Sequence, residues 1–263
     1  MWKRMIHTVS GFIERPFPKD ALIENRYKVI DIIGAGSYGF CYLVVDQTDH
    51  EIKVLKTLRL HKRITDSGKS SFEFEKKLLA SIEHQGFPQY FEEGVHKGIP
   101  FYTMEYLNGK NFEQLIFIEG KNFSEKEVFL IASQLLQLIG HLHDRQIIHR
   151  DIRIPNVIVA DSTIRLIDFG LARKLNQLDA TKRKWKRDLR KEINPQADFY
   201  GLGHFLLFLL YSDFPLPNDK KERSWEEELS ISSGAKHIIR RLLQIEPEYE
   251  NCRQIETDIL EVI

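Results

Sequence analysis

The stretch IIHRDIRIPNVIVADSTIRLIDFG, residues 147–170, decides how the rest of the chain is interpreted. Its alternating apolar segment at 157–159 predicts a short strand, and the polar residues after it predict a turn that folds the chain back as a hairpin. This hairpin would bring Asp151, Asn156 and Asp168 into one small volume. Oxygen-bearing side chains that converge in this way suit a hard cation such as Mg²⁺, and one carboxylate would remain to act as a base.

Length and composition exclude several classes of protein. With 263 residues, 42% of them hydrophobic, the chain can form one large domain or two lobes around a sizeable core. Its 38 basic residues equal its 38 acidic ones, so no charge excess indicates a nucleic-acid partner. Cys41 and Cys252 lie far apart without a CxxC motif. This argues against a disulfide framework or a zinc site and favours a reducing, cytoplasmic compartment.

The N-terminal residues raise the question of membrane contact. No apolar run in the chain reaches the roughly 18 to 20 residues that span a bilayer, so we expect no transmembrane segment. Apolar residues between positions 2 and 13 recur at the spacing of a short amphipathic helix. We expect this helix to pack on the domain; peripheral contact with a membrane surface is the alternative. Pro16 and Pro18 then separate this segment from the rest of the chain.

A glycine-rich turn, GAGSYG at 34–39, lies between two strand-like runs. Glycines allow the backbone to approach phosphate oxygens closely. A dinucleotide-binding fold would require a helix after the last glycine, but an alternating run of β-branched and aromatic residues follows instead. A Walker loop would require Gly-Lys-Ser/Thr at the end of the motif, and this is absent. Both of these nucleotide-binding folds are therefore excluded.

The next strand offers two candidate lysines for a phosphate-binding role. If Lys56 faces a nucleotide, Val54 faces it too and can cover an apolar base, because residues two apart in a strand share a side. If Lys53 does, Glu51 also points there, and a carboxylate beside phosphates would be costly. We therefore predict Lys56 as the phosphate ligand and expect Lys53 to be solvated.

A helix follows, with Ser70 or Ser71 as its expected N-cap. Glu75 lies four residues before Leu79, so both occupy one face, which we expect to turn toward the strands. Glu75 is thus the candidate partner of a buried lysine. Glu73 falls on a different face and is expected to be solvated.

The remainder of the chain predicts mostly helices. A strand at 100–107 would lead into a hinge at Asn108-Gly109. The run at 199–211 is apolar on nearly all sides, so we expect a buried helix there with Asp198 as its N-cap. Further helices are predicted at 112–118, 127–143, 225–229, 235–243 and 255–263.

Together, the glycine-rich turn, strand lysine, helix glutamate, HRDxxxxN and DFG resemble a eukaryotic-type (Hanks-type) protein kinase domain. The resemblance covers about residues 25–260. Within the family, the chain is similar to small stand-alone bacterial Ser/Thr kinases. It implies an α+β, bilobal kinase-like fold with an N-terminal extension at 1–24. A small β-rich N-lobe with one key helix would occupy 25–107, and a larger α-helical C-lobe 108–263.

The resemblance implies an ATP-dependent serine/threonine kinase that transfers the γ-phosphate to protein hydroxyls, with Mg²⁺ or Mn²⁺ as cofactor. Asp151 would orient the substrate hydroxyl as the base, and Arg153, where the family usually has lysine, would contact the γ-phosphate. Lys56 would pair with the α- and β-phosphates and with Glu75. The implied catalytic residues are Asp151, Arg153, Lys56 and Glu75, and the implied metal ligands are Asn156 and Asp168.

The same resemblance implies an ATP site of twelve residues. Glycines and the tip of the turn would cover the phosphates, apolar side chains would sandwich the adenine, and the hinge backbone would read its edge. These residues are Gly34, Gly36, Ser37, Tyr38, Gly39, Cys41, Val54, Lys56, Met104, Glu105, Leu107 and Ile158.

The chain departs from the family pattern after the DFG triplet. No Ala-Pro-Glu occurs between Gly170 and Asp198, and the segment is shorter than usual, so the shelf that docks a peptide substrate would be reduced. Arg150 stands where the family often reads phosphorylation of this segment. Thr181 is the only hydroxyl residue there and is the candidate autophosphorylation site.

Two other functions stay open on the sequence. The reduced shelf would suit a kinase-fold phosphotransferase that acts on a small molecule. A nucleotide-binding pseudokinase is the remaining alternative, although every catalytic position is filled.

Overall fold

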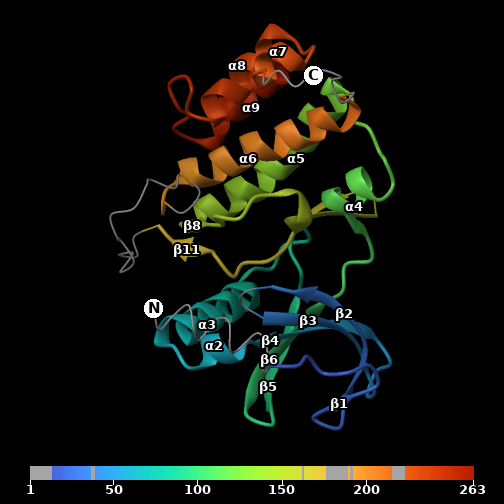
Figure 1. The fold of residues 1–263 in the computed structure, drawn as a ribbon. Helices are drawn as coiled ribbons and strands as arrows, with labels where there is room; N and C mark the ends of the chain where they lie inside the picture. The colour runs from blue at the N-terminus through green and yellow to red at the C-terminus, as the bar shows by residue number, and fades with distance from the viewer. Residues whose placement is uncertain (1–13, 37–38, 162, 176–188, 190–191, 215–222) are drawn as a thin grey trace. The chain divides into compact units, whose positions relative to one another are not determined.

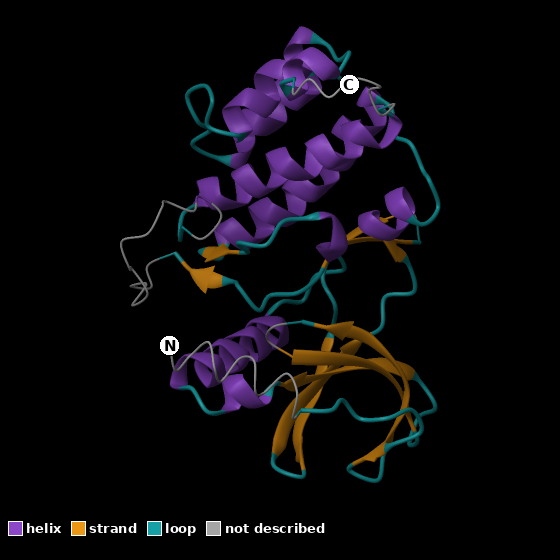
Figure 2. Ribbon diagram, in the orientation of Figure 1, coloured by secondary structure: helices purple, strands orange, loops and turns teal. Residues whose placement is uncertain are grey.

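The computed structural model describes residues 14–36, 39–161, 163–175, 189, 192–214 and 223–263. The chain forms two compact units, Met1–Asn108 and Gly109–Ile263. The first is rich in strands and the second in helices (Figure 1; Figure 2). This content confirms the predicted α+β class with a β-rich part followed by a helical one.

The first unit is built on an antiparallel sheet. In the described residues it has six strands in the order β1-β2-β3-β4-β6-β5. Helices α2 (Leu60–Arg63) and α3 (Asp66–Ser81) separate β4 from β5 along the chain. The strands are β1 (Leu22–Ile23), β2 (Tyr27–Ala35), β3 (Gly39–Asp46), β4 (Ile52–Leu58), β5 (Tyr90–His96) and β6 (Ile99–Glu105).

The two faces of this sheet carry different side chains, because neighbouring residues of a strand point to opposite sides. One face buries a core of aromatic and aliphatic side chains that includes Tyr27, Tyr42 and Phe101. Phe17, from the segment before β1, packs against this core. The N-terminal segment therefore covers part of the face opposite to Lys56.

Helix α3 packs on the Lys56 side of the sheet, where the Phe72 and Tyr102 rings lie 5.2 Å apart. Its N-cap is Thr65, whose hydroxyl accepts a backbone hydrogen bond from the first turn. The prediction of a cap at serine 70 or 71 is therefore wrong. The first turn of α3 is polar, so the apolar spacing that reveals a helix begins only after the helix itself does.

The second unit consists mainly of helices. Helix α6 packs against α5 and α8, and α9 packs against α5. Leu202, Phe205 and Leu206 of α6 are fully buried, as the apolar run predicts. No described helix is both long and apolar enough to cross a bilayer. The helices are α4 (Phe112–Phe117), α5 (Glu125–Asp144), α6 (Pro195–Leu210), α7 (Trp225–Glu228), α8 (Ser233–Leu242) and α9 (Cys252–Leu260).

Helix α6 begins earlier than its apolar run. Asn194 is its N-cap and accepts a hydrogen bond from the Ala197 N–H at 3.1 Å, and Pro195 occupies the first helical position. The prediction that Asp198 is the cap is therefore wrong. Asp198 lies inside the first turn, fully buried, and its carboxylate has other partners.

Short strand pairs position the stretch at 147–170. Strands β9 and β10 form the hairpin that the sequence predicts, and β7 pairs with β9 on its other side. Strand β8 pairs with β11. Between β8 and β9 the chain forms a loop that ends in the 3₁₀ turn η1 (Ile154–Asn156). The short strands are β7 (Lys110–Asn111), β8 (Ile147–Ile148), β9 (Val157–Ala160), β10 (Thr163–Leu166) and β11 (Arg173–Lys174).

Candidate active site

A buried ion pair joins the sheet of the first unit to helix α3. Lys56 Nζ on β4 lies 2.6 Å from Glu75 Oε1 on α3, and the two side chains are 6% and 3% exposed. Glu75 belongs to the buried face of α3, as its helical spacing predicts. Removing one partner of such a pair costs about 3 to 5 kcal/mol, because the other charge is left uncompensated. The lysine is thus held in a defined position.

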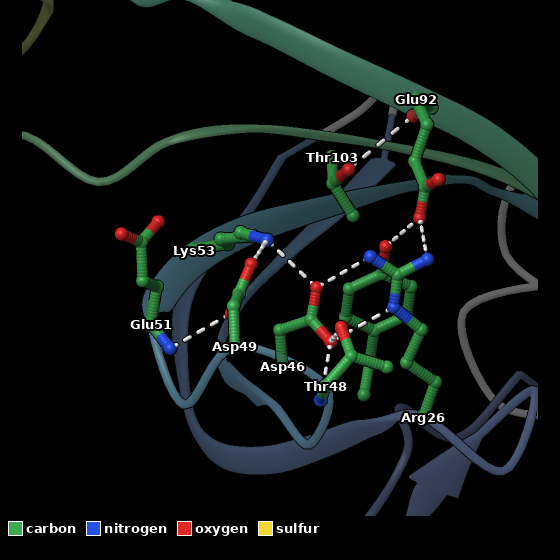
Figure 3. Close-up of polar contacts among 9 residues, drawn as sticks. Arg26, Asp46, Thr48, Asp49, Glu51, Lys53, Glu92 and Thr103 are labelled. Atoms are coloured by element: carbon green, nitrogen blue, oxygen red, sulfur yellow. Dashed lines mark hydrogen bonds and ion pairs between the residues drawn. The ribbon is translucent and has the colours of Figure 1, made fainter.

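The other strand lysine, Lys53, is also buried, so the prediction of a solvated side chain is wrong. It points away from Lys56 and lies between Asp46 at 2.7 Å and Asp49 at 2.5 Å. Figure 3 shows this cluster, in which Asp46 also accepts two hydrogen bonds from Arg26. Alternation along the strand sends the two lysines to opposite faces, but the acids around the β3–β4 turn keep Lys53 from solvent.

The glycine-rich turn between β2 and β3 closes on itself, since Gly36 N–H donates to the Gly39 carbonyl at 3.0 Å. A Cβ atom at position 39 would lie 2.1 Å from the carbonyl oxygen of Thr57 on β4, so glycine is required there. At position 36 the nearest atom would be 4.0 Å away, which leaves room beside the turn. Ser37 and Tyr38 lie outside the described residues.

One face of the sheet carries the other predicted nucleotide residues of the first unit. Cys41 lies directly opposite Lys56, and Val54 directly opposite Met104. Opposite residues share a face, and so do residues two apart in one strand. These four side chains therefore belong to one face, and Gly34 pairs with Cys41 at its edge.

The remaining adenine candidates lie at the end of β6 and on β9. The Glu105 N–H donates to the Gln89 carbonyl at 2.8 Å. If the backbone of Glu105 contacts adenine, the contact would therefore be made by its carbonyl oxygen. The Leu107 side chain is buried. In the second unit, Ile158 lies on β9 opposite Asn111 and is partly exposed.

In the second unit, hydrogen bonds within the loop after β8 hold the Asp151 carboxylate in place. Asn156 Nδ2 donates to the Asp151 carbonyl at 3.0 Å and to Asp151 Oδ2 at 2.7 Å. Arg153 Nε donates to the same carboxylate at 3.1 Å. The Ile167 N–H donates to the Asn156 carbonyl at 2.9 Å, which brings the next residue, Asp168, beside the loop.

Two residues of this region adopt a backbone conformation that L-residues rarely take. Arg150 and Asp168 both have a φ of 66°, a conformation that costs about 1 to 3 kcal/mol and persists only where surrounding contacts enforce it. The Arg150 N–H donates to Asp198 Oδ1 at 2.6 Å, and Asp168 Oδ1 accepts from the Gly170 N–H at 3.3 Å. Enforced strain of this kind concentrates at functional sites.

Asp198, fully buried on α6, supports the loop at 149–151. Its Oδ2 lies 2.9 Å from both the His149 N–H nitrogen and His143 Nε2. Asp198 therefore contacts the backbone of His149 as well as the side chain of His143. The rings of His149 and Phe169 lie 5.0 Å apart, and burial lowers the pKa of His149, which favours the neutral imidazole.

Asn156 and Asp168 offer donors that suit Mg²⁺ or Mn²⁺. The Asn156 nitrogen is engaged with Asp151, which leaves its Oδ1 for a cation, and Asp168 adds a carboxylate. Mg²⁺ commonly takes only one or two carboxylates and completes its shell with phosphates and water. Among the described residues, no three His, Cys, Asp or Glu side chains are grouped to hold a metal. With Asn156 and Asp168 as protein ligands, Mg²⁺ would complete its shell with phosphate oxygens and water.

Comparison with known proteins assigns this arrangement to a family. A family model of the protein kinase domain matches residues 27–263. The chain belongs to the protein kinase family. The match begins at β2, directly before the glycine-rich turn, and runs through the last helix, so this protein kinase carries the family pattern over both units.

Individual relatives agree with this assignment. The kinase is 37% identical over 246 residues to the probable serine/threonine-protein kinase YbdM of Bacillus subtilis, covering 94% of this chain and 93% of the relative. It is 25% identical over 265 residues to the serine/threonine-protein kinase PrkC of the same species, covering 90% of this chain but 40% of PrkC. The PknI kinase domain of Mycobacterium tuberculosis matches with a TM-score of 0.71 at 19% identity, covering 95% of this chain and 100% of that one. This last likeness supports the fold.

The kinase site also includes a residue that the sequence does not single out. His143, in the last turn of α5, contacts Asp198, and Cys252 Sγ lies 3.8 Å from its other ring nitrogen. A histidine on a helix predicted from apolar spacing has no distinguishing signal. Only its nearness along the chain to the loop at 149–151 could have indicated a role.

Proposed function

We propose that this protein kinase transfers the γ-phosphate of ATP to serine and threonine hydroxyls of proteins. The observation that carries the proposal is the Asp151 carboxylate, which Asn156 and Arg153 fix by hydrogen bonds of 2.7 and 3.1 Å. This fixed carboxylate lies near the Asn156 amide and the Asp168 carboxylate, whose oxygens suit a metal ion. Such an arrangement suits phosphoryl transfer, which is catalysed mainly by positioning and by neutralisation of charge. The similarity to YbdM and PrkC, both named serine/threonine-protein kinases, favours serine and threonine as acceptors.

Each of the four candidate side chains in the second unit has a proposed part in the transfer. Asp151 accepts a hydrogen bond from the substrate hydroxyl and so aims its oxygen at the phosphate. Arg153, at present paired with Asp151, contacts the transferred phosphate. Asn156 through Oδ1 and Asp168 through its carboxylate would hold Mg²⁺ or Mn²⁺, which supplies neutralisation of phosphate charge.

The first unit supplies the proposed phosphate and adenine contacts of ATP. Lys56, fixed by Glu75, donates to the α- and β-phosphates, and the glycines of the turn at 34–39 cover them. Cys41, Val54 and Met104 contribute apolar surface for the adenine. We propose one kinase domain over about residues 25–260, preceded by an N-terminal extension.

Regulation by phosphorylation remains part of the proposal. Arg150 is the candidate reader of a phosphate on the segment after β11, and it donates from Nη1 to the Leu171 carbonyl at 3.3 Å. Thr181, the candidate acceptor, lies outside the described residues. A phosphate there would add charge that an arginine can bind.

The rate of transfer in the Asp151→Asn variant tests the proposed function. The variant keeps the size of the side chain but removes the base, so we expect kcat on a generic protein substrate to fall by about 10² to 10⁴. Asp161→Asn, an exposed change of the same kind in the β9–β10 turn, is the matched control and should keep wild-type activity. Equal activity of Asp151→Asn and Asp161→Asn would contradict the proposal.

A further inference from the structure

The segment before β1 places one carboxylate against the start of α2. Glu14 accepts hydrogen bonds from the Leu60 N–H at 2.8 Å and from Arg63 Nη2 at 3.2 Å. Its Oε2 also accepts from Arg59 Nε at 3.4 Å. The Glu14 side chain is only 10% exposed, so these charge-assisted contacts are largely shielded from water and salt. Glu14 therefore ties the N-terminal segment to α2.

Arg59 connects this carboxylate to the glycine-rich turn. Its Nη1 donates to the Gly36 carbonyl at 3.3 Å, and its guanidinium lies 4.7 Å from the centroid of the Phe40 ring. Gly36 and Phe40 flank the tip of the turn, so one side chain contacts the turn on both sides. A planar guanidinium that Glu14 holds at Nε is restricted in its rotation, which keeps it in these two contacts.

Helix α2 also sets the start of α3. A Cβ atom at position 68, in the first turn of α3, would lie 2.4 Å from the Lys62 carbonyl oxygen, so the two helices meet without space between them. Arg63 Nη1 donates to the Gly98 carbonyl at 3.4 Å, which fixes α2 against the β5–β6 turn. Helix α3 carries Glu75, so the position of α2 affects the position of Glu75 in its buried ion pair with Lys56.

Other described contacts of the residues before β2 are of a different kind. Phe17 packs on the core of the sheet, and its N–H donates to the Tyr42 hydroxyl at 3.1 Å. Glu24 Oε1 lies 3.0 Å from His96 Nδ1 on β5. These contacts run to the sheet rather than to the turn or to α2. The effect of Glu14 on nucleotide binding can therefore be separated from the effect of the segment on stability.

We propose that Glu14 is a positioning residue for ATP binding, which acts on the glycine-rich turn through Arg59 and on α3 through α2. This inference rests on the proposed function, because it takes the turn and Lys56 to be the phosphate contacts. Without the carboxylate, Arg59 no longer restrains the turn. The turn then has more conformational freedom before ATP binds, and it loses more of that freedom on binding, which weakens binding. KM for ATP then rises, while kcat, which depends on Asp151, changes little.

Steady-state kinetics of Glu14→Gln test the inference, with Glu24→Gln as the matched control. Both variants remove one negative charge from the residues before β2. We expect KM for ATP to rise about three- to tenfold in Glu14→Gln, with kcat and KM for the protein substrate within about twofold of wild type. Glu24→Gln should keep wild-type kinetics. An unchanged KM for ATP in Glu14→Gln, whatever its melting temperature, would overturn the inference, because Glu14 would then contribute to stability alone.

The route through Arg59 is tested by combining substitutions. Arg59→Lys keeps the charge but lacks the planar fork that reaches Gly36 and stacks on Phe40, so KM for ATP should rise in this variant too. The effects of Arg59→Lys and Glu14→Gln on KM should be less than additive, since both act through one contact. Additive effects would contradict a shared route.

Hydrogen exchange separates the failure of this inference from the failure of the proposed function. It is measured on the protein without nucleotide and requires no phosphoryl transfer. Faster exchange of the amides at 34–40 and 60–64 in Glu14→Gln than in Glu24→Gln supports the inference, and equal exchange overturns it. If the wild-type protein transferred no phosphate, the proposed function would be wrong. The comparison of hydrogen exchange between Glu14→Gln and Glu24→Gln would still test the inference about Glu14.

Discussion

Lys53 and Lys56 differ in their proposed roles because their carboxylate partners differ. Both are buried on β4. Two acids of its own hairpin bind Lys53, so its charge is neutralised on the face opposite to the predicted nucleotide residues. Lys56, on the other face, is paired with Glu75. An ammonium group has three donors, so one ion pair does not by itself prevent contact with a phosphate.

Asp46 is the residue on which the cluster in Figure 3 depends, and its replacement should destabilise the first unit. Its buried carboxylate lies 2.7 Å from both Arg26 and Lys53. Asp46→Asn leaves both cations without this partner, so we expect the free energy of unfolding to fall by about 3 to 5 kcal/mol at pH 7. Asp49→Asn, which removes the more exposed partner of the same lysine, should cost less than about 1 kcal/mol. Chemical denaturation measures both.

The effect of Asp46→Asn should also depend on pH. Hydrogen bonding from Arg26 holds the pKa of the Asp46 carboxyl well below its usual range. A carboxyl whose pKa is lowered on folding contributes stability that is complete above its unfolded pKa of about 3.9 and is lost as the pH falls toward the folded value. The difference in unfolding free energy between wild type and Asp46→Asn should therefore be constant from about pH 7 to 5 and narrow below about pH 4. An unchanged difference at pH 3 and below would contradict this account.

Among the elements, helix α6 supports the loop at 149–151 through its first turn. Asp198→Asn would place an amide N–H₂ where a carboxylate now accepts the N–H groups of His149 and Arg150. We expect it to lower the free energy of unfolding by about 2 to 3 kcal/mol and kcat by at least about tenfold. Asn194→Ala, which removes the N-cap of the same helix, should cost about 1 kcal/mol but keep wild-type kcat. Equal kcat in the two variants would show that Asp198 acts only on stability.

The beginnings of α3 and α6 show where prediction of elements from sequence fails. Apolar spacing predicts both helices, but the first turn of each lies before its apolar run: that of α3 is polar, and that of α6 is Pro-Gln-Ala-Asp. Thr65 and Asn194 therefore cap helices whose starts were expected at Ser70 or Ser71 and at Asp198. Strands β7, β8 and β11 have only two residues each, too few to show an alternating pattern.

At the scale of the whole chain, the order of the motifs predicts the family, and local rules predict much of the candidate site. Strand alternation predicts Lys56 over Lys53, and helical spacing predicts Glu75. Contacts between distant segments have no such signal. Glu14 and Arg59 are 45 residues apart along the chain, and no pattern of polarity in either segment indicates that they meet.

Mass spectrometry of phosphorylated residues can show whether this protein kinase transfers phosphate to serine and threonine. A protein substrate of mixed sequence is incubated with the kinase and ATP, with Mg²⁺ or with excess chelator. We expect new phosphate on serine and threonine side chains of the substrate, dependent on Mg²⁺ and absent with Asp151→Asn. Retention of ATP binding without phosphate on any protein hydroxyl in the presence of Mg²⁺ would contradict it.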